Sequence, residues 1–422
     1  MEKLLMLGSC KASEELFVEA KKRGFYTILA DNCEFKDSKF KVHADERWLV
    51  DTSMLDVLEK KCIESGVTAI INGISTFNIG MTMELCRRLS LPCYCSPEAW
   101  HYTIDKLAFK KLCIDNMVPV AKPYTLSNPP TQQELDSIEF PVVVKAVDQS
   151  ANRGMSYCNS IDELGPAIEY AKSVSKSTEV VVERKLEGIE YGAHYAIADG
   201  KATMYGFASM LSQPGEPGNC YSLTSTVADN LQKFLEEVDP FFKKALSAGN
   251  MNEGVAWIEM ILDKDGHFYV LEMGYRLSGD MIAIPLKDVT GFDSYNWLLD
   301  ISAGKQHCAH DLPSDQITKY SKQGVSYILW SNDTSGVVGA IEGIELIKSI
   351  PNLEIIFDVK EGVKYRSNQY LVTFVFSTDT IDEMIEVISF INRNVKIFDD
   401  SGKNICIYYN DFETIKRIYN QQ

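Results

Sequence analysis

The stretch VAWIEMILDKDGHFYVLEMGYRLSG, residues 255–279, decides how this chain is interpreted. It predicts a β-hairpin whose turn is Asp265-Gly266, a dipeptide that tolerates positive φ at both central positions of a type I′ turn. A two-residue turn at that place sets Glu259 directly opposite Glu272 on the partner strand. The hairpin therefore carries two carboxylates at its centre.

These two glutamates share a face with apolar residues, because side chains alternate along a strand. The expected companions on that face are Val255, Trp257, Ile261, Phe268 and Val270. Paired carboxylates among apolar groups repel each other unless a cation lies between them. A hard divalent cation such as Mg²⁺ prefers carboxylate oxygens and also recruits substrate phosphates. Arg276 brings a positive charge to the same end of the hairpin. The alternative is an ordinary amphipathic hairpin with both glutamates in water.

The composition is typical of a soluble globular protein with two or three domains. The 422 residues are 45% hydrophobic and 24% charged. The net charge of −17 argues against a polyanion-binding surface, because such surfaces need clustered basic residues. Eleven cysteines without a CxxC spacing predict reduced thiols. No signal peptide or membrane span is evident, so we expect a cytoplasmic protein that binds neither nucleic acid nor membrane.

The chain divides into three predicted parts. Residues 1–103 alternate short strands with amphipathic helices, which predicts a doubly wound parallel sheet ending in a strand over 92–95. Residues 104–311 begin with a helix over 105–116 and then turn to long strands, hairpins and few helices. Residues 312–422 are expected to be α+β. The predicted fold class is thus a multidomain chain of α/β and α+β parts.

A lysine and a small-residue loop follow one another in the second part. The apolar strand at 141–145 ends in Lys145, and a lysine at the end of a buried strand needs an anionic partner. In the loop after it, backbone N–H groups can cover phosphate oxygens. The loop candidates are Ser150, Ala151, Arg153 and Gly154. The other interpretation is a polar hairpin loop with a snorkelling lysine.

A second candidate segment runs from 180 to 190. An apolar strand ends at Glu183 and passes into an extended link, whose backbone can pair with an adenine edge. The Glu183 carboxylate can accept from an exocyclic amine, and Glu190 can accept from ribose hydroxyls. A surface connector between two hairpins is the alternative.

Taken in order along the chain, these features resemble the ATP-grasp superfamily. The first part resembles the pre-ATP-grasp, Rossmann-like domain, and Asp105-Lys106 resembles the family's DK at the start of a nucleotide-contacting helix. The resemblance implies that ATP is bound by Lys106, Lys145, Ser150, Ala151, Arg153, Gly154, Glu183, Arg184, Lys185, Leu186 and Glu190. It implies Mg²⁺, or alternatively Mn²⁺, on Glu259 and Glu272. It assigns catalysis to Arg276 and Lys145.

The chain departs from the family pattern at Gly274. The usual motif around the second glutamate is Glu-x-Asn-x-Arg, and Gly274 stands at the asparagine position. This removes an oxygen that would help to hold a metal, so the number of metal ions is open. Ser150 and Ala151 also stand where many members carry glycine, which predicts a stiffer phosphate loop.

The resemblance implies an ATP-dependent carbon–nitrogen ligase with small carboxylate and amine substrates, similar to the amino-acid ligase and carbamoyl-phosphate-synthase-like groups. Alternatives are a carboxyphosphate-forming or glycinamide-ribonucleotide-type enzyme, and an inactive nucleotide-binding sensor or subunit. The substrates stay open, and a homodimer is the assembly we consider. Two weaker candidates are interpreted as structural. The run His307-Cys308-Ala309-His310 is interpreted as a loop cluster rather than a zinc site, and His194 as a core or sheet-face histidine, with a place lining the site as the alternative.

Overall fold

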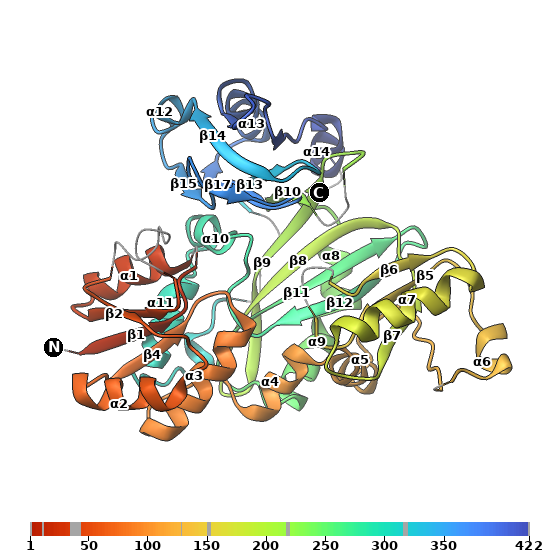
Figure 1. The fold of residues 1–422 in the computed structure, drawn as a ribbon, viewed down its shortest axis with the longest axis horizontal. Coiled ribbons are helices and arrows are strands. Elements are labelled where there is room, and N and C mark those ends of the chain that lie inside the picture. The colour runs from red at the N-terminus through yellow and green to blue at the C-terminus, as the bar shows by residue number, and fades with distance from the viewer. Residues whose placement is uncertain are drawn as a thin grey trace.

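The structure is a computed structural model of the chain. It describes residues 2–10, 12–33, 44–127, 129–149, 153–216, 220–314 and 320–420. The side chains of residues 12 and 13 are outside the description. Figure 1 shows a parallel sheet at the N-terminus, a long antiparallel sheet through the middle, a small sheet at one side and a C-terminal layer above.

The N-terminal part is the parallel α/β unit that the sequence predicts. Its sheet has the order β3-β2-β1-β4, and all pairs are parallel. The elements are β1 (Lys3–Leu7), α1 (Ala12–Lys22), β2 (Tyr26–Asp31), β3 (Glu46–Leu49), α2 (Leu55–Ser65), β4 (Ala69–Asn72) and α3 (Thr76–Leu89). The expected strand over 92–95 is wrong, because that segment has no ladder partner, and β3 was not foreseen. The four-residue β3 alternates exposed and buried residues too briefly for a periodic signal.

Two helices lead from this unit to the middle of the chain, and the second places a lysine at the cavity described below. They are α4 (Pro97–Ile104) and α5 (Lys106–Asp115). The Asp105 carboxylate accepts hydrogen bonds from the backbone N–H groups of Leu107 and Ala108, both at 2.9 Å. This N-cap fixes the start of α5 and puts Lys106 at its first helical position. A short helix, α6 (Gln132–Asp136), follows.

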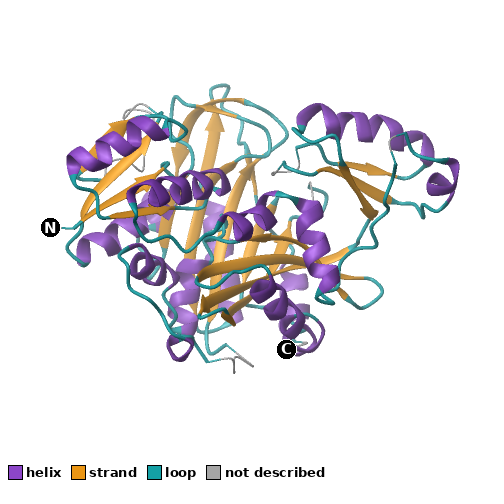
Figure 2. Ribbon diagram, turned by 90° about the horizontal axis from the view of Figure 1, so that it is seen from below, coloured by secondary structure: helices purple, strands orange, loops and turns teal. Residues whose placement is uncertain are grey.

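A small antiparallel sheet stands at one side of the molecule. Its order is β6-β5-β7, from β5 (Val142–Ala146), β6 (Ser156–Cys158) and β7 (Val180–Arg184). The helix α7 (Ile161–Val174) covers one face and builds a separate apolar core with β5. Seen from below, this sheet and its helix project from the body of the molecule (Figure 2). Val143 and Lys145, on the other face, line the cavity described below.

The large antiparallel sheet forms the centre of the molecule. Its first strands are β8 (Gly188–Ala198), β9 (Lys201–Ser212), β10 (Tyr221–Ser225), β11 (Gly254–Asp263) and β12 (Phe268–Gly274), in the order β12-β11-β8-β9-β10. Its helices are α8 (Leu231–Glu237), α9 (Asp239–Ala248), α10 (Ala283–Thr290), α11 (Ser294–Ser302) and the 3₁₀ turn η3 (Ala309–Asp311). The expectation of few helices in this part is therefore wrong. Helices α8, α9 and α10 have only seven to ten residues and few buried apolar positions, so their periodic signal in the sequence is weak.

The C-terminal part extends the same sheet rather than forming a detached unit. Strand β13 (Gln323–Ser331) pairs with β10, and β17 (Tyr370–Thr378) and β15 (Glu354–Phe357) continue outward. A further sheet has the order β16-β14-β18. The remaining elements are β14 (Gly336–Glu342), α12 (Ile344–Ile347), β16 (Lys364–Tyr365), α13 (Ile381–Asn394), β18 (Lys396–Asp399), β19 (Cys406–Ile407) and α14 (Phe412–Tyr419).

The hairpin β11–β12 has the predicted pairing of its two glutamates but not the predicted turn. Its loop has three residues, since the Asp263 N–H bonds to the His267 carbonyl at 3.0 Å and Gly266 alone has positive φ, at 83°. The predicted type I′ turn is therefore wrong. A bulge at Leu271 adds one residue to β12, and Glu259 again lies opposite Glu272. Between the turn and that bulge, the side chains of β12 point to the opposite face of the sheet from the one predicted. Phe268 therefore packs into the core rather than beside the glutamates.

Candidate active site

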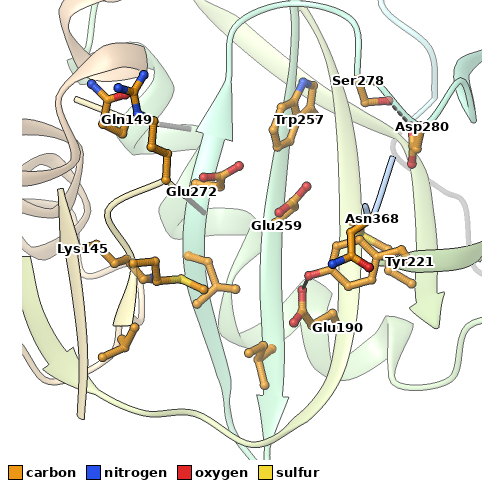
Figure 3. Close-up of a pocket in the computed structure, with 18 of the residues that line it drawn as sticks. Lys145, Gln149, Glu190, Tyr221, Trp257, Glu259, Glu272, Ser278, Asp280 and Asn368 are labelled. Carbon is orange, nitrogen blue, oxygen red and sulfur yellow. Dashed lines mark hydrogen bonds between the residues drawn. The ribbon is translucent and has the colours of Figure 1, made fainter. Parts of the chain in front are cut away.

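The pocket-facing surface of the large sheet is laid out in rows across three strands. One row contains Gly192 of β8, Glu259 of β11 and Glu272 of β12, which are register partners. Both glutamates point into the same cavity, side by side on neighbouring strands (Figure 3). Because Gly192 has no side chain, the space next to Glu259 stays open on the β8 side. The predicted pair of facing carboxylates is confirmed in its geometry.

The next row consists of His194, Trp257 and Gly274. The indole of Trp257 covers Gly274 so closely that a Cβ on Gly274 would lie 2.3 Å from the indole Cε2. The Arg276 guanidinium stacks on the same ring, with its Cζ 5.0 Å from the ring centroid. The position where the family pattern has an asparagine is thus filled from the neighbouring strand by an aromatic ring.

The cavity has a volume of about 1160 Å³ and lies between the small sheet and the large one. Its floor is formed by the rows just described, and its far wall comes from β13 and the segment 364–370. The predicted residues that line it are Lys106, Lys145, Arg153, Glu183, Arg184, Lys185, Leu186, Glu190, Glu259, Glu272 and Arg276. Residues from five separate stretches of sequence therefore meet at one cavity.

Glu183 is the centre of a buried ion-pair triad. Only 2% of this residue is exposed, and its carboxylate accepts hydrogen bonds from Lys110 and from Lys145, the latter at 2.6 Å. Burial alone would raise the pKa of Glu183, but the two lysines outweigh it and hold the pKa below its usual value. For Lys145, burial acts to lower the pKa and the Glu183 carboxylate reverses the effect, so the lysine is charged. Glu183 therefore fixes Lys145 in the cavity, and Lys110 is a partner that the sequence did not suggest.

The segment around the predicted phosphate loop is only partly described. Ser150 and Ala151 lie outside the described residues. Arg153 lines the cavity, whereas Gly154, at φ 75°, packs against β5 and α7, where a Cβ would come within 2.8 Å of the Ala146 Cβ. Lys106 donates to the Gln149 carbonyl, which ties α5 to the start of this loop. Burial lowers the pKa of Lys106, partly offset by the nearby Glu272.

The predicted adenine link lines the cavity, and the predicted ribose acceptor Glu190 lies on the other side of the two glutamates from Trp257 (Figure 3). Arg184 lines the cavity and forms ion pairs to Asp263 at 2.8 Å and to Asp265 at 3.2 Å. Glu190 accepts a hydrogen bond from the hydroxyl of Tyr221 on β10. Burial raises the pKa of Glu190 to about 7, against the effect of that hydrogen bond.

Arg276 is fixed by contacts to two parts of the chain. Its Nε donates to Thr76 Oγ1 at the start of α3, at 3.1 Å, and its Nη1 donates to the Leu277 carbonyl at 2.7 Å. Burial lowers the pKa of Arg276, while the Glu272 carboxylate acts to raise it. The arginine thus joins the start of α3 in the N-terminal unit to the segment that follows β12.

The two glutamates form a suitable site for a divalent cation. Burial raises the pKa of Glu259 well above its usual value, and the charges of Glu272, Glu190 and Asp280 raise it further. A cation between the carboxylates would remove this repulsion and return Glu259 to its ionised form. Mg²⁺ is usually held by one or two carboxylates together with waters and substrate phosphates, which matches this donor set.

Several residues at the cavity were not identified from the sequence as part of a site. His194, expected to be structural, lines the cavity with only 4% of its surface exposed, and burial lowers its pKa. Asp280 accepts from Ser278 Oγ at 2.6 Å at the Trp257 end (Figure 3). His194 lies four residues after Glu190, and Asp280 lies four residues after Arg276. No spacing in the sequence identifies either of them as part of a site.

Two expectations concern features away from the cavity. Cys308, His310 and Asp311 bring ligand atoms within 4.8 Å of one another, all exposed on η3. They come from a single turn, so the interpretation as a loop cluster is retained. In the part of the chain that the structure describes, every helix is too short or too polar to cross a membrane.

Comparison with known proteins gives an independent result for the same segment. Residues 138–284 match a family described as the ATP-grasp domain. A formate-dependent phosphoribosylglycinamide formyltransferase of Francisella tularensis subsp. holarctica (strain OSU18) is 26% identical over 193 residues, which cover 44% of this chain and 48% of that protein. The match thus spans about half the length of the curated relatives.

Solved structures share the fold over nearly the whole chain. An L-amino acid ligase from Bacillus licheniformis has a TM-score of 0.76 at 17% identity, covering 95% of this chain and 99% of the ligase. The biotin carboxylase domain of 2-oxoglutarate carboxylase from Hydrogenobacter thermophilus, solved with MgADP and bicarbonate, has a TM-score of 0.74 at 14% identity, covering 99% and 93%. At these identities the likeness concerns the fold.

The matched domain, the three-part fold and the cavity agree with one another. Residues 138–284 match the ATP-grasp domain, and nearly the whole chain shares the fold of the ligase and carboxylase structures named above. Its parallel N-terminal sheet and its central and C-terminal antiparallel sheets are the three parts of that fold.

Proposed function

We propose that the protein is an ATP- and Mg²⁺-dependent ligase that joins a carboxylate to an amine through an acyl phosphate. The observation that carries the proposal is the row formed by Glu259 and Glu272, which points into a cavity also reached by Lys145 and Arg276. Two desolvated carboxylates beside three or more cations suit a polyphosphate and its metal ion, and nothing in a purely structural protein requires them.

The described residues have separable tasks in this reaction. Lys145, held by Glu183, and Lys106, held by the Gln149 carbonyl, would neutralise phosphate oxygens. The backbone at 184–186 would contact adenine, because both oxygens of the Glu183 carboxylate are already engaged by lysines. Glu190 would exchange the Tyr221 hydroxyl for a ribose hydroxyl. Bound between Glu259 and Glu272, Mg²⁺ would offset charge on the phosphates during transfer.

The substrate carboxylate would attack the γ-phosphorus and release ADP, and the amine would then displace phosphate from the acyl phosphate. Arg276 would stabilise the oxyanion that develops in the second step, since a preorganised donor costs no reorganisation when charge appears. Its anchors at Thr76 and Leu277 keep the guanidinium in place before substrate arrives. Amino-acid-like substrates are proposed because a whole-chain structural neighbour is an L-amino acid ligase.

A second candidate uses a smaller acid. The sequence relatives are formate-dependent enzymes that act on phosphoribosylglycinamide, and a structural neighbour was solved with bicarbonate. Formate or bicarbonate would then replace the amino-acid carboxylate in the same first step.

The proposal is tested by measuring ADP and phosphate release over pairs of acids and amines, with hydroxylamine present to trap the acyl phosphate as a hydroxamate. We expect one class of acid to give hydroxamate, and Glu272→Gln to abolish it while far-UV circular dichroism stays unchanged. Glu187→Gln, an exposed neighbour outside the cavity lining, is the matched control. Full activity of Glu272→Gln would reject the metal-binding role.

A further inference from the structure

The cavity wall opposite Lys145 is a turn over 364–370 that carries two cations. Figure 3 shows Asn368 of this turn on the far side of the two glutamates from Lys145. Lys364 and Arg366 line the same cavity. We propose that this turn binds a second anionic group of the substrate, a carboxylate or phosphate remote from the reacting atoms. The inference rests on the function proposed above, because it concerns the substrate of the same cavity.

The charges of these two residues are not used elsewhere. Among the residues that the structure describes, neither Lys364 nor Arg366 has a carboxylate within ion-pair distance. By contrast, Lys145, Arg184 and Lys185 at the same cavity are each paired with a carboxylate. Two unpaired cations beside a cavity make it attractive to an anion, and arginine is suited to the two oxygens of a carboxylate or phosphate.

The backbone of the turn is held in a fixed shape before any ligand binds. Ser331 Oγ donates to the Arg366 carbonyl at 2.6 Å and accepts from the Gln369 N–H at 2.9 Å. The Gln369 side chain accepts from the Arg366 N–H at 2.9 Å. The Asn368 N–H donates to the Asn332 carbonyl at 3.1 Å, with Asn368 in the left-handed region at φ 51°. A preorganised backbone lowers the entropic cost of binding, which is what a ligand-recognition turn requires.

An unmet hydrogen bond marks the same turn. The side-chain oxygen of Asn368 is shielded from water and has no hydrogen-bond partner among the described residues. A buried acceptor without a donor is costly, and a ligand carrying an N–H or O–H group would relieve that cost. The turn therefore suits an anionic group with a hydrogen-bond donor close to it, as found in amino acids with acidic side chains and in phosphorylated hydroxy compounds.

Isothermal titration calorimetry on the MgADP complex of the full chain tests this subsite. The probes are O-phospho-L-serine, L-glutamate and L-glutamine at matched ionic strength. We expect at least one anionic probe to bind about tenfold or more tightly than L-glutamine, as one or two charge-assisted hydrogen bonds allow. Preference for O-phospho-L-serine identifies a phosphate site, and preference for L-glutamate a carboxylate site.

Arg366→Gln and Lys364→Gln should each remove most of this preference and leave MgADP affinity within about twofold. Lys403→Gln, an exposed lysine outside the cavity that loses the same charge, should leave the preference intact. Equal binding of all three probes, or a preference that survives both cavity substitutions, overturns the proposal. If anions bind through Arg366 while no acid–amine pair yields ADP, the subsite stands and the ligase function fails. If ADP is released without any anion preference, the ligase function stands and the subsite fails.

Discussion

The contact between Gly274 and Trp257 makes a sharp prediction about substitution at a single glycine. Gly274 lies in β12 with an ordinary backbone conformation, so any cost of adding a side chain there is steric. An alanine Cβ would lie 2.3 Å from Trp257 Cε2 and 2.5 Å from both Cζ2 and Nε1. No real contact is that short, so the indole must move.

The size of the effect follows from what the indole does. Overpacking a filled site costs about 1–3 kcal/mol, and loss of the guanidinium stacking of Arg276 adds about 0.5–2 kcal/mol. We therefore expect Gly274→Ala to lower the free energy of unfolding by roughly 2–4 kcal/mol. Because Arg276 loses its platform, the same substitution should also reduce the rate of ligation.

Urea denaturation followed by circular dichroism measures this cost in a double-mutant cycle with Trp257→Ala. In the Trp257→Ala background the added methyl meets no ring, and its cost should fall below about 0.5 kcal/mol. Gly165→Ala is the control, since a Cβ there has nothing within 4 Å and α7 should gain up to about 1 kcal/mol. A cost for Gly274→Ala below about 0.5 kcal/mol, or an equal cost in both backgrounds, would refute the reasoning.

Two further predictions concern buried charge. Glu183→Gln leaves Lys110 and Lys145 without their shared anion and should cost about 3–5 kcal/mol in urea denaturation, whereas Glu139→Gln, which breaks an exposed pair, should leave the free energy of unfolding nearly unchanged. Equal costs would contradict the triad. Burial raises the pKa of Glu15 from 4.5 to about 7, so the unfolded chain loses this proton first and stability should fall as pH rises between those values. Glu15→Gln should remove about 1 kcal/mol of that fall, seen by comparing denaturation at pH 5 and pH 8, and an unchanged pH dependence would contradict the assignment.

The hairpin shows how far sequence reasoning reaches. The dipeptide Asp199-Gly200 forms the two-residue turn with positive φ at both residues, at 50° and 68°, as its pattern predicts. The same dipeptide at 265–266 forms a longer loop, and a bulge at Leu271 restores the pairing of the glutamates. Turn residues narrow the choice of loop, but bulges depend on tertiary packing that a local pattern does not contain.

The residues that the sequence did not identify were missed for the same reason. Lys110 lies one helical turn after Lys106, yet only the fold shows that its ammonium group reaches Glu183 on β7. The turn 364–370 begins 85 residues after the last recognised motif, which ends at Gly279, and faces the cavity because β13 pairs with β10. Such contacts arise from sheet order, which no spacing within one segment reveals. By contrast, the helix predicted over 105–116 forms over Lys106–Asp115, because its start depends on a local interaction, the N-cap of Asp105.

The neighbours of Gly274 explain why glycine suits the position where the Glu-x-Asn-x-Arg motif has asparagine. A glycine there, considered alone, only removes a metal ligand. The structure shows that Trp257 fills the vacated space and supports Arg276. The two positions are therefore coupled, and an asparagine introduced at Gly274 without a smaller residue at Trp257 should clash rather than add an oxygen to the metal site.

The account depends most directly on a divalent cation held between Glu259 and Glu272. A crystal structure with Mn²⁺ and a non-hydrolysable ATP analogue tests this through the anomalous signal of manganese. We expect a peak between the two carboxylates and in contact with the triphosphate. A triphosphate bound in the cavity with no manganese at these glutamates would contradict the central claim.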